Sequence, residues 1–264
     1  MSVHAFAQTL PLQSGIIYGP VRSRRLGLSL GINVLPTAYK LCSFNCIYCQ
    51  YGWTIKPTVS PTHQLKDLPR PSQVMAALKG ALEELQGQGK TLNCVTFCGN
   101  GEPTLYPDLG EVVVGTRSLR DQIFPRATLA ILSNSSTVSR EEVRETLRLV
   151  DLRVMKLDAG SEDLIRRINA PALPFHLEEI VSGLKKLKDI TLQSLFVQGR
   201  LTNTDRDSVA LWIEKVREIQ PAVVQVYSLD RVPADRRLGK VDRTTLREIA
   251  AQVRRSAGVA AEVF

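Results

Sequence analysis

The chain has 264 residues, of which 44% are hydrophobic and 23% are charged. This composition excludes an intrinsically disordered chain and provides enough apolar residues for a large buried core. The 34 Lys and Arg residues exceed the 26 Asp and Glu residues, giving a net charge of +8 that favours an anionic partner, although a well-solvated basic surface explains the same charge.

The sequence gives no sign of a segment that enters or crosses a membrane. The first residues, from Met1 to Pro11, lack the basic start and apolar stretch of a secretory signal, and no run of about 18 apolar residues follows. We therefore expect a cytoplasmic protein with no membrane partner. Because thiols stay reduced in the cytoplasm, its five cysteines are expected to be ligands, nucleophiles or core residues rather than disulfide partners.

Hydrophobic periodicity predicts buried strands that alternate with helices along the chain. The expected strands run from Leu28 to Leu35, Leu92 to Cys98, Ala127 to Ser133, Leu152 to Asp158, Ile190 to Val197 and Val223 to Ser228. Apolar stripes at helical spacing follow them, from Val74 to Leu85, Leu109 to Thr116, Val143 to Val150, Leu177 to Leu187, Val209 to Val216 and Leu246 to Val253. Ser139 and Glu142 form a capping-box pattern that places the start of the third helix.

Strict alternation of strands and helices predicts an α/β fold with a parallel sheet. An open twisted sheet and a partial (β/α)6 TIM-like barrel both fit the pattern, and the prediction is the partial barrel as a single domain. Residues 1–27 are taken as an N-terminal extension and residues 28–264 as the core domain. The irregular stretch at 36–71 is expected to be functional, because it is long and follows the carboxyl end of a strand.

That stretch contains three cysteines, Cys42, Cys46 and Cys49, with the spacing C-x3-C-x2-C. Three soft ligands on one short loop suit zinc or an iron-sulfur cluster. A closed zinc site needs a fourth ligand, for which His63 is the nearby candidate. Unligated core thiols are a further alternative, but the neighbouring polar residues disfavour it.

An aromatic residue, Tyr48, stands directly before the third cysteine. With this feature the loop resembles that of the radical S-adenosylmethionine (SAM) superfamily. The resemblance implies one 4Fe-4S cluster on Cys42, Cys46 and Cys49, with Tyr48 beside the cofactor and SAM on the fourth iron. It also implies an electron donor such as flavodoxin or ferredoxin, and reductive cleavage of SAM to a 5′-deoxyadenosyl radical that abstracts hydrogen from a substrate.

The second expected strand leads into a glycine-rich turn, Gly99-Asn-Gly-Glu-Pro-Thr104. Its glycines allow a close backbone approach, and Glu102 presents a carboxylate whose natural partner is a positively charged amino group. The superfamily has a glycine-rich motif ending in Glu-Pro at this place. The resemblance thus implies SAM contacts at Gly99, Gly101, Glu102 and Pro103, with Glu102 on the amino group.

Polar side chains at the next strand ends complete the expected SAM site. Ser133, Asn134 and Ser135 suit ribose hydroxyls and a carboxylate, although they are also common turn residues. Lys156 and Asp158 share a strand face and either bind SAM or pair with each other. The resemblance adds adenine contacts after the fifth strand, with Gln198 as the candidate, followed by Arg200 and Asn203.

Cys94 and Cys98 lie four residues apart on the second expected strand and therefore face the same side. Two small buried thiols are the simplest explanation. Because Cys98 immediately precedes the glycine turn, we also consider it a candidate catalytic residue, as a hydrogen donor or radical relay.

The stretches from Gly19 to Asn33 and from Leu195 to Gly199 resemble a branch of the superfamily that is grouped with wyosine synthases, the enzymes that remodel a tRNA guanine. The absence of any cysteine before Cys42 distinguishes the chain from the wyosine synthases themselves, which carry a second cluster. A tRNA base is therefore one substrate candidate, with Arg22, Arg24 and Arg25 gripping phosphates. The alternatives are a glycyl-radical-enzyme activase, a small-metabolite enzyme, and a metal-stabilised binding module without catalysis.

Overall fold

The computed structural model describes residues 9–54, 56–58, 65, 67–172 and 174–264, and a twisted sheet lies at its centre. The order of its strands is β1-β2-β5-β6-β7-β8-β10-β12. Their bounds are β1 Ile17–Ser23, β2 Gly27–Ile32, β5 Cys94–Phe97, β6 Thr128–Ser133, β7 Leu152–Lys156, β8 Thr191–Leu195, β10 Val223–Tyr227 and β12 Ala261–Val263. Only β1 runs antiparallel to its neighbour, so the carboxyl ends of the other strands meet at one edge. The predicted α/β architecture with a mainly parallel sheet is confirmed.

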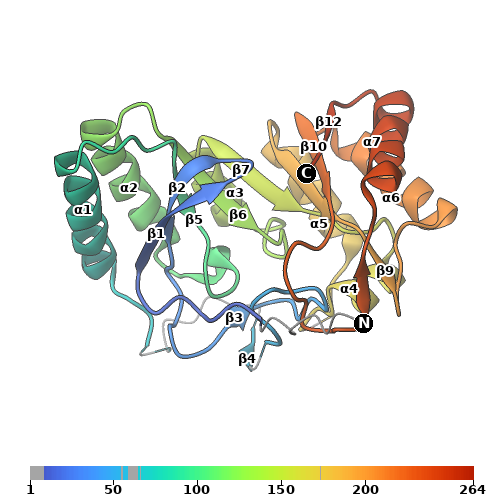
Figure 1. The fold of residues 1–264 in the computed structure, drawn as a ribbon, viewed down its shortest axis with the longest axis horizontal. Coiled ribbons are helices and arrows are strands. Elements are labelled where there is room, and N and C mark those ends of the chain that lie inside the picture. The colour runs from blue at the N-terminus through green and yellow to red at the C-terminus, as the bar shows by residue number, and fades with distance from the viewer. Residues whose placement is uncertain (1–8, 55, 59–64, 66, 173) are drawn as a thin grey trace, which may run out of the picture.

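Helices cover the outer face of this curved sheet (Figure 1). They are α1 Pro71–Gly87, α2 Leu109–Ile123, α3 Glu141–Arg148, α4 Glu162–Ile168, α5 Leu177–Leu187, α6 Arg206–Ile219 and α7 Arg243–Ala257. Each predicted stripe is the buried face of its helix, as in α1, where Val74, Leu78 and Leu82 are fully buried. This burial explains why the periodic pattern located the helices, because an amphipathic face is stable only against a sheet or another helix.

Some elements were not expected from the sequence. β1, within the segment taken as an extension, is an edge strand paired with β2, and β12 extends the sheet beside β10. α4 is a short helix with three buried apolar residues, too few to show a helical period. The predicted capping box is wrong: α3 begins after Arg140, and no side chain caps it. Ser139 lies one residue too early, since a cap must directly precede the first helical residue.

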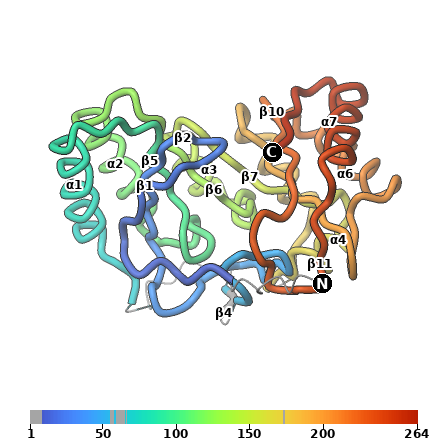
Figure 2. Tube along the Cα trace, viewed as in Figure 1, coloured from blue at the N-terminus to red at the C-terminus, as the bar shows by residue number. Residues whose placement is uncertain are grey.

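The described residues that follow β2, residues 33–54, run along one end of the sheet, below the strands in the orientation shown (Figure 2). The chain between β2 and α1 contains two short paired strands, β3 Leu41–Cys42 and β4 Lys56–Pro57. A second two-stranded ribbon joins β9 Val197–Gly199 to β11 Leu238–Lys240. No helix in the described ranges is long and apolar enough to cross a membrane.

Candidate active site

The three loop cysteines are held by backbone contacts to neighbouring elements. Cys42 belongs to β3, whose Leu41 amide donates to the Asn100 carbonyl in the glycine turn at 2.9 Å. Cys46 and Cys49 share a tight turn in which the Cys49 amide donates to the Cys46 carbonyl at 3.0 Å. All three cysteines are free and half-buried as residues, and the sequence-predicted ligands lie on one structured loop at the carboxyl edge of the sheet.

Two asparagines donate hydrogen bonds to sulfur atoms of this loop. Asn134 Nδ2 lies 3.5 Å from Cys42 Sγ, and Asn169 Nδ2 lies 3.4 Å from Cys46 Sγ. Burial raises the pKa of the Cys42 thiol to about 12 and that of Cys46 to about 11, so each thiolate needs compensation from a cation or from donors. Amide donors aimed at sulfur are the kind of outer contact that tunes thiolate-bound clusters. The donor set therefore fits an iron-sulfur cluster.

No site for a single metal ion is present among the described residues. In the described part of the chain, no three His, Cys, Asp or Glu side chains converge on one point. A cluster does not require such convergence, because its cysteines bind different iron atoms. His63, the candidate fourth zinc ligand, lies outside the described residues.

The glycine turn after β5 packs directly on the cysteine loop. A Cβ atom on Gly101 would lie 1.7 Å from the Leu41 carbonyl oxygen, and the φ of Gly101 is +145°. The Glu102 amide donates to that same carbonyl at 3.1 Å. Only glycine permits this approach, and Pro103 then begins a short 3-10 helix, Pro103–Leu105.

The Glu102 carboxylate is 1% exposed and turned toward its own turn and β6. One oxygen accepts from the Thr104 amide at 3.1 Å and the Thr104 hydroxyl at 2.6 Å, and the other accepts from the Asn134 amide at 2.6 Å. Burial raises the pKa of Glu102, and these donors oppose the rise. The carboxylate thus joins the ends of β5 and β6, a structural task that the sequence did not indicate.

Ser133, the last residue of β6, and the two residues that follow it have different partners. Ser133 Oγ accepts from the Ser135 amide at 3.1 Å, and Asn134 Nδ2 also donates to Ser43 Oγ at 2.9 Å. Ser135 has a positive φ of 69°, and its buried Oγ has no partner among the described residues. A strained residue with an unsatisfied hydroxyl is typical of a functional strand end.

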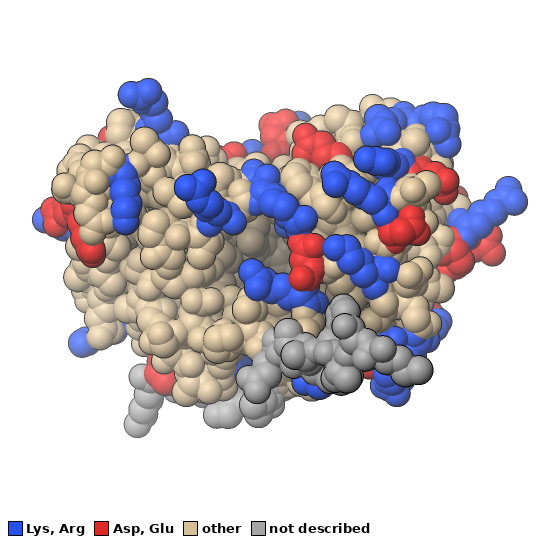
Figure 3. Space-filling view, in the orientation of Figure 1, with Lys and Arg blue, Asp and Glu red and all other residues tan. Residues whose placement is uncertain are grey.

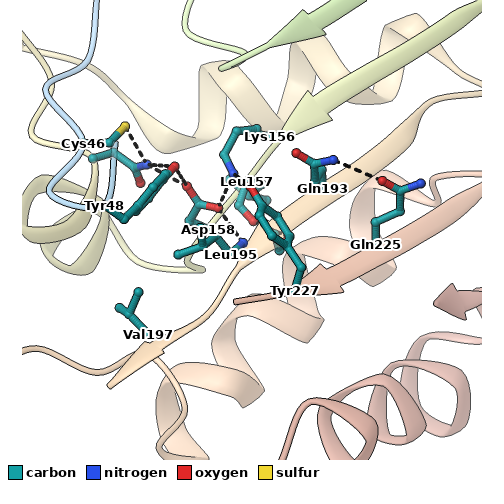
Figure 4. Close-up of polar contacts among 12 residues, drawn as sticks. Cys46, Tyr48, Lys156, Leu157, Asp158, Gln193, Leu195, Val197, Gln225 and Tyr227 are labelled. Atoms are coloured by element: carbon teal, nitrogen blue, oxygen red, sulfur yellow. Dashed lines mark hydrogen bonds and ion pairs between the residues drawn. The ribbon is translucent and has the colours of Figure 1, made fainter. Parts of the chain in front are cut away.

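Lys156 and Asp158, the two polar residues at the end of β7, form an ion pair of 3.2 Å. Tyr48 donates a short hydrogen bond to the other oxygen of Asp158, which also accepts from Asn169 Nδ2 at 2.7 Å. Lys156 Nζ donates to the Tyr227 hydroxyl at 2.7 Å, and the negative charge of Asp158 raises the pKa of Lys156 although burial opposes it. In Figure 4 these side chains lie next to one another near the strand ends, with Cys46 at one end of the row and Tyr227 at the other. This network anchors the cysteine loop to the sheet.

A cavity of about 390 Å³ opens beside the loop, inside the curved sheet. Six of the predicted site residues line it, namely Tyr48, Cys49, Cys98, Gly99, Gly101 and Lys156, whereas Glu102 and the polar residues at the end of β6 do not. Cys98 Sγ lies 2.7 Å from the hydroxyl of Tyr18, another lining residue. Burial raises the pKa of Cys98 to about 11, which keeps it a thiol at neutral pH, whereas Cys94 is buried in the sheet.

The residues expected after the fifth strand do not join the cavity lining. Gln198 is exposed on β9, where its Nε2 donates to the Lys240 carbonyl at 2.7 Å. Arg200 pairs with Asp235 at 2.7 Å. Asn203 holds the backbone around β8, since its Nδ2 donates to the Leu195 carbonyl at 2.9 Å.

Several residues of the site were not identified from the sequence. Asn169 follows α4 and touches Cys46, Tyr48 and Asp158, while Tyr18 and Tyr227 contribute hydroxyls from β1 and β10. Tyr227 lies next to the end of the strand expected from Val223 to Ser228, which is the one signal that pointed to it. Asn169 and Tyr18 belong to elements that the periodic pattern did not reveal.

A family model described as the Radical SAM superfamily matches residues 38–212 of the chain. The UPF0026 protein of Synechocystis sp. is 33% identical over 212 residues, covering 80% of this chain and 74% of that protein. The UPF0026 protein of Methanocaldococcus jannaschii is 32% identical over 225 residues, covering 84% and 65%. A protein of Brachyspira hyodysenteriae named GTPase Obg is 31% identical over 223 residues, but the chain spans only 31% of its length.

Two solved structures share the fold at low sequence identity. A radical SAM methyltransferase from Sphaerobacter thermophilus superposes with a TM-score of 0.65 at 14% identity, over 89% of this chain and 65% of that chain. A structure of TYW1 with a lysine-pyruvate adduct gives a TM-score of 0.62 at 19% identity, over 87% and 74%. These structures support the partial-barrel architecture.

Proposed function

The chain belongs to the radical SAM superfamily, and from this premise we propose that it binds one 4Fe-4S cluster through Cys42, Cys46 and Cys49 and cleaves SAM in the adjoining cavity. Membership implies both cofactors and sets aside a binding module without catalysis. The observation that carries the proposal is the cavity itself, because Cys49 of the cysteine loop and Gly99 and Gly101 of the glycine turn line the same space. When bound and reduced, the cluster would supply the electron that splits SAM into methionine and a 5′-deoxyadenosyl radical.

The chain's own residues position these groups. Tyr48, Asp158 and Asn169 fix the loop against the ends of β7 and α4, and the glycine turn brings backbone close to the cysteines. We assign SAM contacts to the glycine turn with Glu102, to the residues at the end of β6, and to Lys156. Gln198 is not part of this assignment, since its side chain is used on the Lys240 carbonyl outside the cavity.

Cys98 is the proposed catalytic residue on the substrate side. It lines the cavity as a protonated thiol and contacts the Tyr18 hydroxyl at 2.7 Å. A thiol with a raised pKa is a poor nucleophile but keeps the S–H bond that hydrogen donation to a substrate radical requires. Donation would leave a thiyl radical on Cys98, which one electron from the electron carrier and one proton from solvent would return to the thiol.

The substrate and the wyosine-synthase-like branch are finer parts of the proposal. The net charge of +8 supports a tRNA base. The arginine cluster supports it less than the sequence suggests, because Arg24 pairs with Asp230 and Arg25 faces the cavity, leaving Arg22 exposed. An activase or small-metabolite reaction would use the same cavity, and an electron carrier such as flavodoxin or ferredoxin would serve in each case.

Anaerobic reconstitution with iron and sulfide tests the cofactor proposal. We expect about four irons per chain, lost when Cys42, Cys46 or Cys49 is replaced by alanine. The matched control is Cys94→Ala, which removes a thiol from the sheet and should retain the iron. With dithionite, the parent should release 5′-deoxyadenosine from SAM; equal iron loss in the control, or no cleavage by a loaded parent, would refute the proposal.

A further inference from the structure

Arg25, in the turn between β1 and β2, points into the cavity rather than into solvent. Its guanidinium carbon lies 4.3 Å from the ring centre of Tyr227 and 5.0 Å from that of Phe264. The turn thus reaches across to the last strands of the sheet, and the two rings hold the guanidinium in place.

The carboxylates near Arg25 have other partners. Asp230 pairs with Arg24 and Lys240, and Asp158 pairs with Lys156. Within the described part of the chain, Arg25 has no carboxylate at ion-pair distance, and its buried Nε has no hydrogen-bond acceptor. Burial without a counter-charge lowers the pKa of Arg25.

An unsatisfied buried donor on a cation is costly and is retained where a ligand completes it. The cavity wall has a matching charge balance, with Arg25, Lys156 and Arg231 against a single carboxylate, Asp230, which is already paired. Lys and Arg side chains gather beside the hollow in the middle of this face (Figure 3).

We infer that Arg25 recognises an anionic group, a carboxylate or a phosphate, on the substrate that enters this cavity. The inference rests on the proposed function and adds the chemical class of the substrate to it. A planar guanidinium fork, fixed by two aromatic rings, can bind either anion through two parallel hydrogen bonds. The same contact would orient the substrate relative to Cys98 and Cys49, which line the same cavity.

The test uses the reconstituted parent protein saturated with SAM, in anaerobic equilibrium dialysis against radiolabelled orthophosphate and, separately, acetate. Arg25→Met retains most of the apolar stem and removes the charge, and Arg25→Lys retains the charge without the fork. The matched control is Arg247→Gln, which removes the same charge from an exposed position on α7, outside the cavity lining.

We expect the parent to bind at least one of the two anions, with orthophosphate alone assigning a phosphate and acetate alone a carboxylate. Arg25→Met should weaken that binding tenfold or more, Arg25→Lys several-fold, and Arg247→Gln less than twofold. Unchanged binding in Arg25→Met, or no binding by the SAM-saturated parent, would overturn the inference. A parent that binds the anion but does not cleave SAM would instead refute the proposed function.

Discussion

Replacement of Glu102 by glutamine tests two roles of its carboxylate: the hydrogen bonds that join the ends of β5 and β6, and the proposed contact with the SAM ammonium. Both oxygens of Glu102 accept hydrogen bonds, so the NH2 group of the glutamine must point at one or more donors that then lose their acceptor. The least costly orientation directs it at Thr104, whose hydroxyl also contacts Thr137 Oγ1 at 2.6 Å and can turn to accept. The Thr104 amide then loses its acceptor, and one orphaned buried amide costs about 1 to 3 kcal/mol of unfolding free energy.

The charge change should also be visible in SAM binding. Loss of a charge-assisted hydrogen bond to the SAM ammonium weakens binding by about tenfold to a hundredfold, while the cysteines and the iron content are untouched. Thr104→Val is the matched control, since it removes a donor to Glu102 and keeps the carboxylate. We expect it to lower stability in urea unfolding without a comparable loss of SAM affinity in calorimetry.

The pH dependence of stability gives a second readout. Burial raises the pKa of Glu102 above its usual value, so the folded state holds its proton more tightly than the unfolded state. The associated stability is present at pH values below 4.5 and is lost as pH rises through the raised pKa. Glu102→Gln should remove this dependence. An unchanged SAM dissociation constant in Glu102→Gln, or an equal loss in Thr104→Val, would refute the assignment to the ammonium.

Three further outcomes are expected. Gly101→Ala should lower the unfolding free energy, measured in urea, by about 2 to 4 kcal/mol, because its Cβ would lie 1.7 Å from the Leu41 carbonyl oxygen. The control Gly80→Ala adds a Cβ in open space on α1 and should raise the unfolding free energy by about 0.5 to 1 kcal/mol. Alkylation of Cys98 in the native cluster-free protein should rise through a pKa of about 11, and a midpoint near 9, the ordinary thiol value, would contradict its burial. If tRNA is bound, Arg22→Glu should flatten the dependence of log affinity on log salt by about 0.7 to 0.9, and an unchanged slope would exclude this phosphate contact.

The sequence by itself was sufficient for the elements that repeat. Buried parallel strands and the amphipathic helices between them carry a periodic pattern because each must place apolar side chains toward one core. The same holds for the cysteine loop and the glycine turn, whose residues are adjacent in the chain. Edge strand β1 and short helix α4 carry no such pattern, since one is half-exposed and the other buries only three apolar residues.

The contacts that build the site were decided by the tertiary structure. Tyr48 and Asp158 are 110 residues apart, and Cys46 and Asn169 are 123 residues apart, so only the curvature of the sheet and the position of α4 bring them together. The same packing surrounds both oxygens of the Glu102 carboxylate with hydrogen-bond donors. It also gives Arg22, Arg24 and Arg25 different surroundings, although their positions in the sequence suggested one common role. Local chemistry is a property of residue type and spacing, but the partner of each group depends on which strand ends meet.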